Sequence, residues 1–129
     1  MSDPEIMREW IDKAEEDAAV AEREGRVRKQ PAPGAVCYHA QQCIEKYLKA
    51  VLQKQTKPIP KSHDLPVLFD QCTFEHFAAL IDREGLVSLS RYATRFRYPG
   101  DAANSDDAKQ ALLLMRRYRA TLREMLRIK

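Results

Sequence analysis

The stretch from Cys37 to Leu52 constrains the fold of this chain more than any other part of the sequence. Its apolar side chains recur at the three- and four-residue spacing of an amphipathic helix, not at the alternating spacing of a strand. The other side carries a mixed set of polar residues: His39, Gln42, Glu45, Lys46, Lys49 and Gln53. The pattern predicts a helix from about Val36 to Gln55, with one face for a core and one for chemistry or contacts.

The rest of the chain repeats the helical pattern and contains no strand candidate. Ser2, followed three residues later by Glu5, is typical of a helix N-cap, and Gly25 is expected to end this first helix. Further helices are expected after Ser62 or Asp64, from Thr73 to Gly85, from Leu86 to Phe96, and from Ser105 to the end of the chain. We therefore expect one all-α domain over residues 1–129, an up-and-down helical bundle with a short broken helical crossing in the middle.

Composition excludes several classes of protein. No apolar run approaches the roughly 18 residues that suggest a membrane span, and the acidic N-terminus lacks a signal-like apolar core. The three cysteines show no paired spacing, which indicates reduced, buried thiols. We therefore expect a cytoplasmic protein that does not contact a membrane.

Charge is distributed unevenly, although the net charge is only +3. The first helical segment is mainly acidic and the last one, from about Arg116 to Lys129, is mainly basic. Such asymmetry is found in nucleic-acid-binding proteins. The alternative, which we favour, is that the acidic and basic helices lie near one another on a solvated surface.

No known metal or cofactor motif is present. The chain contains no G-x-G-x-x-G, no P-loop and no H-E-x-x-H sequence. His39 and Cys43 lie four residues apart and could offer two metal ligands from one helix face, but nothing nearby completes a site. The sequence therefore predicts no cofactor, no metal and no catalytic residue of a standard kind.

A group of cationic residues precedes the Pro99-Gly100 turn. Arg91 and Arg95 share one helix face by their spacing, and Arg97 and Tyr98 follow at the helix end. Guanidinium groups bind phosphate oxygens in pairs, so these residues could hold a phosphate. Salt bridges to the acidic first helix are an equally good interpretation, and both remain open from sequence.

Three motifs in this order resemble the HEPN family (higher eukaryotes and prokaryotes nucleotide-binding domain). They are Cys37-Tyr38-His39-Ala40-Gln41-Gln42-Cys43-Ile44-Glu45-Lys46-Tyr47-Leu48-Lys49-Ala50, His63-Asp64-Leu65 and Arg97-Tyr98-Pro99. The resemblance implies a helical bundle that usually forms a homodimer with a polar cleft near its interface. It also implies a small nucleotidyltransferase as a partner, in several cases as toxin and antitoxin.

Many members of that family are metal-independent ribonucleases with an arginine followed four to six residues later by a histidine. No histidine follows Arg91, Arg95 or Arg97 here, because the last one is His76. The resemblance therefore implies a non-nuclease module that binds nucleotide or RNA. The residues expected to bind the ligand are His39, Gln42, Lys46, Lys49, His63, Arg95, Arg97 and Tyr98.

Two other functions remain open from sequence. The polar face of the central helix could be an interface to a second copy or to the transferase, in a protein–protein interaction module without any ligand. The chain could also be an unconventional metal-independent ribonuclease that uses His39 or His63 for proton transfer.

Overall fold

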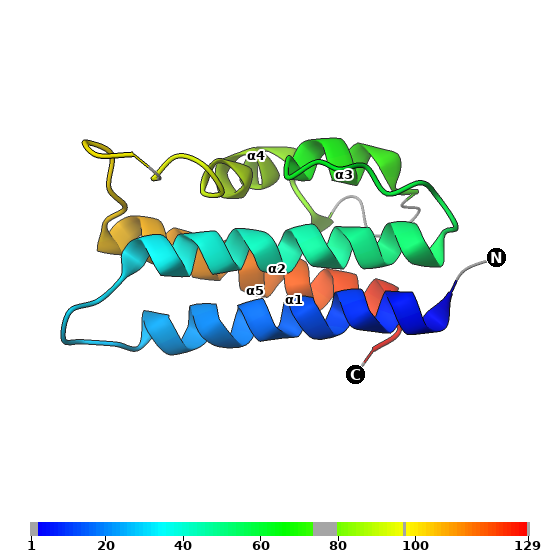
Figure 1. Cartoon of the computed structure of the whole chain (residues 1–129), viewed down its shortest axis with the longest axis horizontal. Coiled ribbons are helices and arrows are strands. Elements are labelled where there is room, and N and C mark those ends of the chain that lie inside the picture. The colour runs from blue at the N-terminus through cyan, green and yellow to red at the C-terminus, as the bar shows by residue number, and fades with distance from the viewer. Residues whose placement is uncertain (1–2, 74–79, 97, 129) are drawn as a thin grey trace.

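The structure is a computed structural model that describes residues 3–73, 80–96 and 98–128. Within that part it contains five helices and no strand: α1 (Pro4–Gly25), α2 (Pro33–Lys54), α3 (Leu65–Gln71), α4 (Arg83–Arg91) and α5 (Ser105–Met125). The three long helices lie lengthwise beside one another, and α3 and α4 lie along one side of α2 (Figure 1). The all-helical prediction, with three long helices and a broken crossing between the second and the last, is confirmed.

The crossing determines the direction of the last helix. α3 and α4 bring the chain back to the end of the bundle where α2 begins, so α5 runs in the same direction as α2 (Figure 1). α1 runs opposite to both. Buried side chains from all five helices form one core, in which Tyr47, Ile44 and Tyr118 are among the largest.

Helix α1 begins at a different cap from the one expected. The N-cap is Asp3, whose Oδ1 accepts hydrogen bonds from the backbone N–H groups of Glu5 at 2.9 Å and Ile6 at 3.3 Å. Ser2 lies outside the described residues. α1 ends at Gly25, as predicted.

The packing of α1 against α2 follows from small side chains. Ala14, Ala18 and Ala21 are buried, so the two backbones can approach closely, as the sequence predicts. The buried apolar side chains of α1 begin at Ile11, whereas Ile6, in its first turn, is 42% exposed.

Helix α2 occupies the centre of the bundle. It spans Pro33–Lys54, close to the prediction, and begins three residues early because proline suits the first helical position. Its apolar face is fully buried at Ile44, Leu48 and Leu52. Its polar face is also largely buried, which the sequence pattern does not predict.

The boundary predicted at Gly85 was wrong. Helix α4 spans Arg83–Arg91, with Asp82 as N-cap accepting the backbone N–H of Gly85 at 2.8 Å. Gly85 lies buried in the first turn, where a β-carbon would be 1.8 Å from the Tyr118 hydroxyl. Residues 74–79, which carry much of the predicted Thr73–Gly85 helix, lie outside the described residues.

Helix α5 brings the basic end of the chain onto α1. Its N-cap is Asn104, not Ser105, and Asn104 and Asp107 form a reciprocal capping box. Arg119 Nε donates to Glu15 at 2.7 Å, and Arg116 Nε donates to Glu22 at 2.9 Å. The acidic and basic helices are therefore neighbours that pair with each other, as favoured from sequence.

Candidate functional site

A buried carboxylate, Glu45, is the centre of a polar cluster on α2. Lys49 Nζ donates to Glu45 Oε2 at 3.2 Å, and the amides of Gln41 and Gln42 donate to Oε1 at 3.4 and 3.3 Å. Gln42 also donates to Gln41 Oε1 at 2.8 Å. A charge removed from water is costly unless it is paired and hydrogen-bonded. This carboxylate is both, and no buried side-chain nitrogen or oxygen among the described residues lacks a partner.

His63 covers this cluster from the loop before α3. Its Nδ1 lies 3.0 Å from Glu45 Oε1 and 3.2 Å from Oε2, and its backbone carbonyl accepts from Gln41 at 2.8 Å. The side chain of Glu45 is 4% exposed and that of His63 is 71% exposed. Because a carboxylate can only accept hydrogen bonds, Nδ1 is the donor, and Nε2 is left for solvent or a ligand.

A second carboxylate, Asp17 of α1, forms a similar cluster farther along α2. His39 Nδ1 lies 2.8 Å from Asp17 Oδ1, and Lys46 Nζ donates to Oδ2 at 2.5 Å. Each cluster thus contains one carboxylate, one ammonium group and one imidazole. With neutral imidazoles both clusters have no net charge, so the lysines carry little surplus charge for a phosphate.

The predicted ligand-binding residues are therefore distributed over several places. The structure brings Gln42, Lys49 and His63 together at Glu45, and His39 and Lys46 together at Asp17. Arg95 instead faces Asp101 at 3.8 Å, and Tyr98 is 74% exposed. Arg97 lies outside the described residues.

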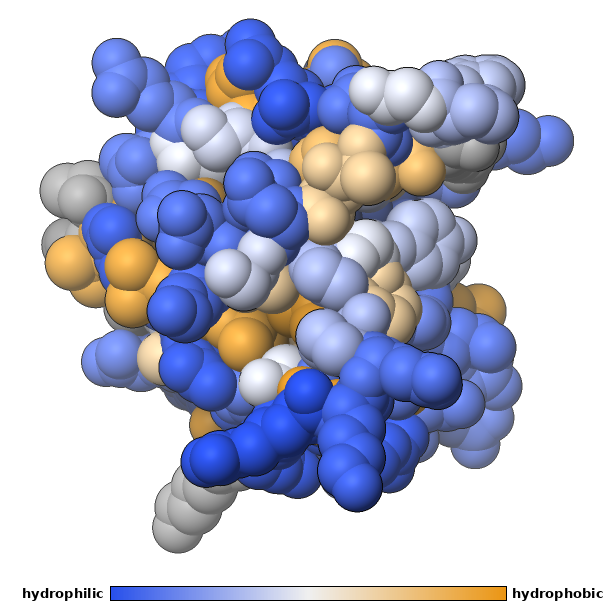
Figure 2. All heavy atoms as spheres, turned by 90° about the vertical axis from the view of Figure 1, so that its left-hand side faces the viewer, coloured by the Kyte–Doolittle hydropathy of each residue, from blue (hydrophilic) through white to orange (hydrophobic). Residues whose placement is uncertain are grey.

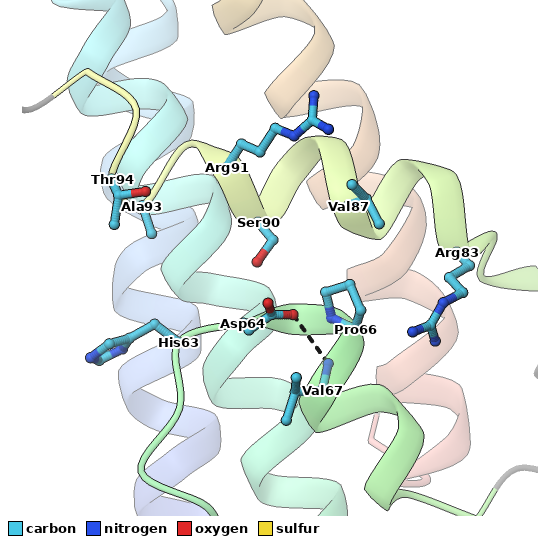
Figure 3. Close-up of a pocket in the computed structure, with 10 residues that line it drawn as sticks. All are labelled: His63, Asp64, Pro66, Val67, Arg83, Val87, Ser90, Arg91, Ala93 and Thr94. Atoms are coloured by element: carbon cyan, nitrogen blue, oxygen red, sulfur yellow. Dashed lines mark hydrogen bonds between the residues drawn. The ribbon is translucent and has the colours of Figure 1, made fainter.

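A pocket of about 520 Å³ lies beside His63, between α3 and α4. The close-up shows Asp64, Pro66 and Val67 of the α3 side facing Val87 and Ser90 of α4 (Figure 3). The remaining lining residues are His63, Arg83, Arg91, Ala93 and Thr94. Apolar and polar side chains meet here, as is usual for small-molecule sites of this size.

The polar groups of this pocket differ in how firmly they are held. Asp64 caps α3 by accepting the backbone N–H of Val67, as drawn in Figure 3. Ser90 Oγ accepts the backbone N–H of Leu65 at 2.9 Å. Arg91 is exposed and forms no ion pair with any described residue, in contrast to the arginines of α5 that pair with α1. Arg91 is therefore a cation on the pocket lining that has no ion-pair partner among the described residues, and its side chain extends away from Asp64 and Pro66 in the close-up (Figure 3).

Arg83, at the other end of the pocket, already forms an ion pair with a carboxylate. Its guanidinium contacts the carboxylate of Asp70 on α3, and this contact raises the pKa of Arg83. Both side chains are about half exposed, so the pair is solvated and contributes little to stability. A phosphate could compete with Asp70 for this guanidinium.

The sequence prediction omitted Glu45, Ser90 and Arg83 from the site. The Glu45 and Lys49 positions are one helical turn apart, and that spacing was a usable signal of an ion pair. Ser90 and Arg83 join the pocket only because α4 packs beside α3, and no local spacing in the sequence indicates that contact.

The described part of the chain contains neither a cluster of metal-binding side chains nor an activated cysteine. No group of three or more His, Cys, Asp and Glu side chains there could hold a metal ion. Cys37 and Cys43 are buried and Cys72 is half-buried. Burial raises the pKa of Cys37 and of Cys72 to about 12, which keeps both thiols protonated and unreactive.

No helix among the described residues is sufficiently long and apolar to span a membrane.

The fold and these clusters define an all-α bundle with a buried polar network on its central helix. The HEPN domain matches residues 7–125, which is nearly the whole chain, and the protein belongs to this family. The crystal structure of TT1696 from Thermus thermophilus has the same fold, with a TM-score of 0.74 and 22% sequence identity over 92% of this chain and 96% of that one. No curated protein matches the chain by sequence.

Proposed function

We propose that this HEPN domain binds the phosphate of a nucleotide or of RNA in the pocket between α3 and α4. The observation that supports this best is the pocket itself, which combines Arg91 without an ion-pair partner among the described residues, the solvent-facing side of His63 and an apolar wall at Val87. A nucleotide needs a cation for its phosphate and an apolar surface for its base or sugar. Both are present within one pocket of suitable volume.

The other residues expected from sequence receive revised roles in this proposal. Gln42 and Lys49 hold Glu45, which in turn holds His63. His39 and Lys46 serve the contact between α1 and α2 through Asp17. The exposed side chains beyond α4, Arg95 and Tyr98, with Arg97 between them in the sequence, would extend the phosphate-binding surface for a longer RNA.

The test is calorimetric titration at low salt with AMP, GMP, ATP and a short oligouridylate. Arg91→Ala should weaken binding by about tenfold or more, because a charge-assisted hydrogen bond contributes roughly 1.5–3 kcal/mol. Lys13→Ala is the matched control, since Lys13 is exposed on α1 and also forms no ion pair with a described residue. Equal weakening by both changes, or no binding of any probe, would contradict the proposal.

We further propose that the protein acts as a homodimer beside a small nucleotidyltransferase. This rests on its membership of the family, and light scattering and co-purification with the product of a neighbouring gene are the measurements. If the partner binds but no nucleotide or RNA does, the chain is an interaction module without a ligand.

The geometry of His63 allows a direct test of the remaining alternative, an unconventional metal-independent ribonuclease. A carboxylate on Nδ1 is the arrangement that orients a histidine for acid–base work, so RNA cleavage in the presence of a chelator should be assayed. We expect none, because no histidine follows the arginines at the family position. If the protein cleaves RNA and a folded His63→Ala variant does not, the protein is a ribonuclease that uses His63.

A further inference from the structure

A second hollow, of about 220 Å³, lies at the end of the bundle where α1 ends and where α2 and α5 begin. Its walls are mainly aliphatic and proline side chains: Val27, Pro31, Pro33, Val36, Ala108 and Leu112. Figure 2 shows this end of the molecule, where hydrophobic atoms are exposed in a depression surrounded by hydrophilic ones. Val27 is itself 37% exposed, so apolar surface here is open to water.

One cation lines this hollow and three more lie on the loop that contributes Val27 and Pro31 to its wall. Arg26, Arg28 and Lys29 lie on the connecting loop between α1 and α2, and Lys109 lines the α5 side. All four are exposed, and none lies within ion-pair distance of a described carboxylate, although Arg26 also interacts electrostatically with Glu22. Of the acidic residues at this end, Glu24 lines the hollow, and Asp106 and Asp107 lie in the first turn of α5. We call the hollow and these four cations the bundle-end patch.

The four cations of the bundle-end patch differ from several basic side chains of α2 and α5 that are matched to carboxylates, as at Lys46 with Asp17 and Arg119 with Glu15. Four exposed cations at one end of the bundle, without such partners, make the local potential more positive. An anionic group that neutralises them would bind favourably, and more so at low salt.

The size and lining of the hollow indicate what kind of anion fits. Small-molecule pockets usually measure about 300–1,000 Å³, so this hollow is too small for most ligands but suits a single aliphatic side chain. Proteins that bind single-stranded nucleic acid without sequence preference stack bases on aromatic rings, and no aromatic residue in the described part of the chain lines this hollow. An apolar socket with a cationic rim matches a peptide that carries an aliphatic anchor between carboxylates.

We propose that the bundle-end patch docks an acidic peptide segment of a partner protein. One aliphatic side chain enters the hollow between Val27, Val36 and Leu112, and flanking carboxylates contact the four rim cations. This interaction is independent of the α3–α4 pocket. It gives the basic loop between α1 and α2 a specific role.

The experiment titrates the full chain with a fluorescent peptide, Glu-Asp-Glu-Leu-Glu-Asp-Glu, and with the same peptide carrying serine in place of leucine. The leucine peptide should bind about tenfold tighter, because burying its side chain removes apolar surface from water. It should also shift the NMR methyl signals of Val27, Val36 and Leu112.

A charge-reversal pair tests the rim. Arg28→Glu with Lys29→Glu should weaken the leucine peptide by about tenfold and flatten its salt dependence. Lys13→Glu with Lys54→Glu makes the same change in net charge at exposed positions away from the hollow, and should leave binding within about twofold. Circular dichroism checks that all variants remain folded.

Several results would overturn the proposal. Equal affinity for the leucine and serine peptides would show that the hollow binds no aliphatic side chain. Equal weakening by the two charge-reversal variants would show that the peptide responds only to the net charge of the protein. Displacement of the peptide by oligouridylate, with shifts at the same methyl groups, would assign the patch to RNA. Shifts of those signals with protein concentration alone would assign it to a second copy of the chain.

Discussion

Gly85 and Gly34 occupy opposite environments although both lie in the first turn of a helix. A β-carbon at Gly85 would lie 1.8 Å from the Tyr118 hydroxyl and 2.7 Å from Asp82 Oδ2. Neither group can move cheaply, because Tyr118 is fully buried and donates to Asp82, which caps α4. At Gly34 no atom lies within 4 Å of the added carbon.

We predict opposite effects of alanine at these glycines. Gly85→Ala should destabilise the protein by about 1–3 kcal/mol, because the overpacked site must displace Tyr118 or break the cap. Gly34→Ala should stabilise it by about 0.5–1 kcal/mol through helix propensity and a less flexible unfolded chain. Urea denaturation measures both, and a neutral Gly85→Ala would show that α4 does not approach α5 so closely.

Helix α2 carries two buried side chains of opposite charge that form an ion pair. Glu45 and Lys49 are one turn apart on the same helix and are both nearly inaccessible to water. Lys49 Nζ also lies 5.5 Å from the centre of the Trp10 ring of α1, a cation–π contact. Removing one member of such a pair leaves the other buried without its counter-charge.

We predict that Glu45→Ala destabilises the protein by roughly 3–5 kcal/mol, the usual effect of breaking a buried ion pair. The double change Glu45→Met with Lys49→Met should cost much less, because two apolar groups of similar size need no partners. Urea unfolding of Glu45→Met, Lys49→Met and the double variant gives the coupling energy. Additive effects would show that Glu45 and Lys49 do not interact in the folded protein.

On the scale of the whole molecule, ion pairs between distant parts of the chain join α1 to α5. Burial raises the pKa of Glu15, but hydrogen bonds from Arg119 and Tyr47 outweigh it and lower the pKa below its usual value. The hydrogen bond from Arg116 lowers the pKa of Glu22, and that from Tyr118 lowers the pKa of Asp82. All three carboxylates are therefore more acidic in the folded chain than in the unfolded one.

This gives a definite direction to the pH dependence. A carboxylate with a lowered folded-state pKa contributes stability above its unfolded pKa of about 4, and that stability is lost as pH falls through the lower, folded-state pKa. The urea midpoint should therefore be constant near pH ~6 and fall below about pH 4. Arg119→Met should make the urea midpoint fall less steeply with decreasing pH, because Glu15 loses its strongest hydrogen-bond donor. A midpoint that rises on acidification would contradict the assignment of these pairs.

Much of the fold could be predicted because helical periodicity is a local property. The spacing of apolar residues from Val36 to Leu52 places α2, and the small residues of α1 predict its close packing. The opposite charges of the first and last helices indicated a contact that Arg119 and Glu15 make. Caps were displaced by one residue, since Asp, Asn and Ser are almost equivalent at that position.

The candidate site depended on contacts that no local pattern contains. The polar face of α2 looked available to a ligand from sequence. Only the packed structure shows that Glu45 binds Lys49 and the loop residue His63, and that Asp17 binds His39 and Lys46. The α3–α4 pocket likewise exists because two short helices pack beside each other. Sequence by itself determined which residues lie on one helix face, because that follows from the roughly 3.6 residues per turn of an α-helix. Tertiary structure decided which charges remain unpaired, because that depends on which helices become neighbours.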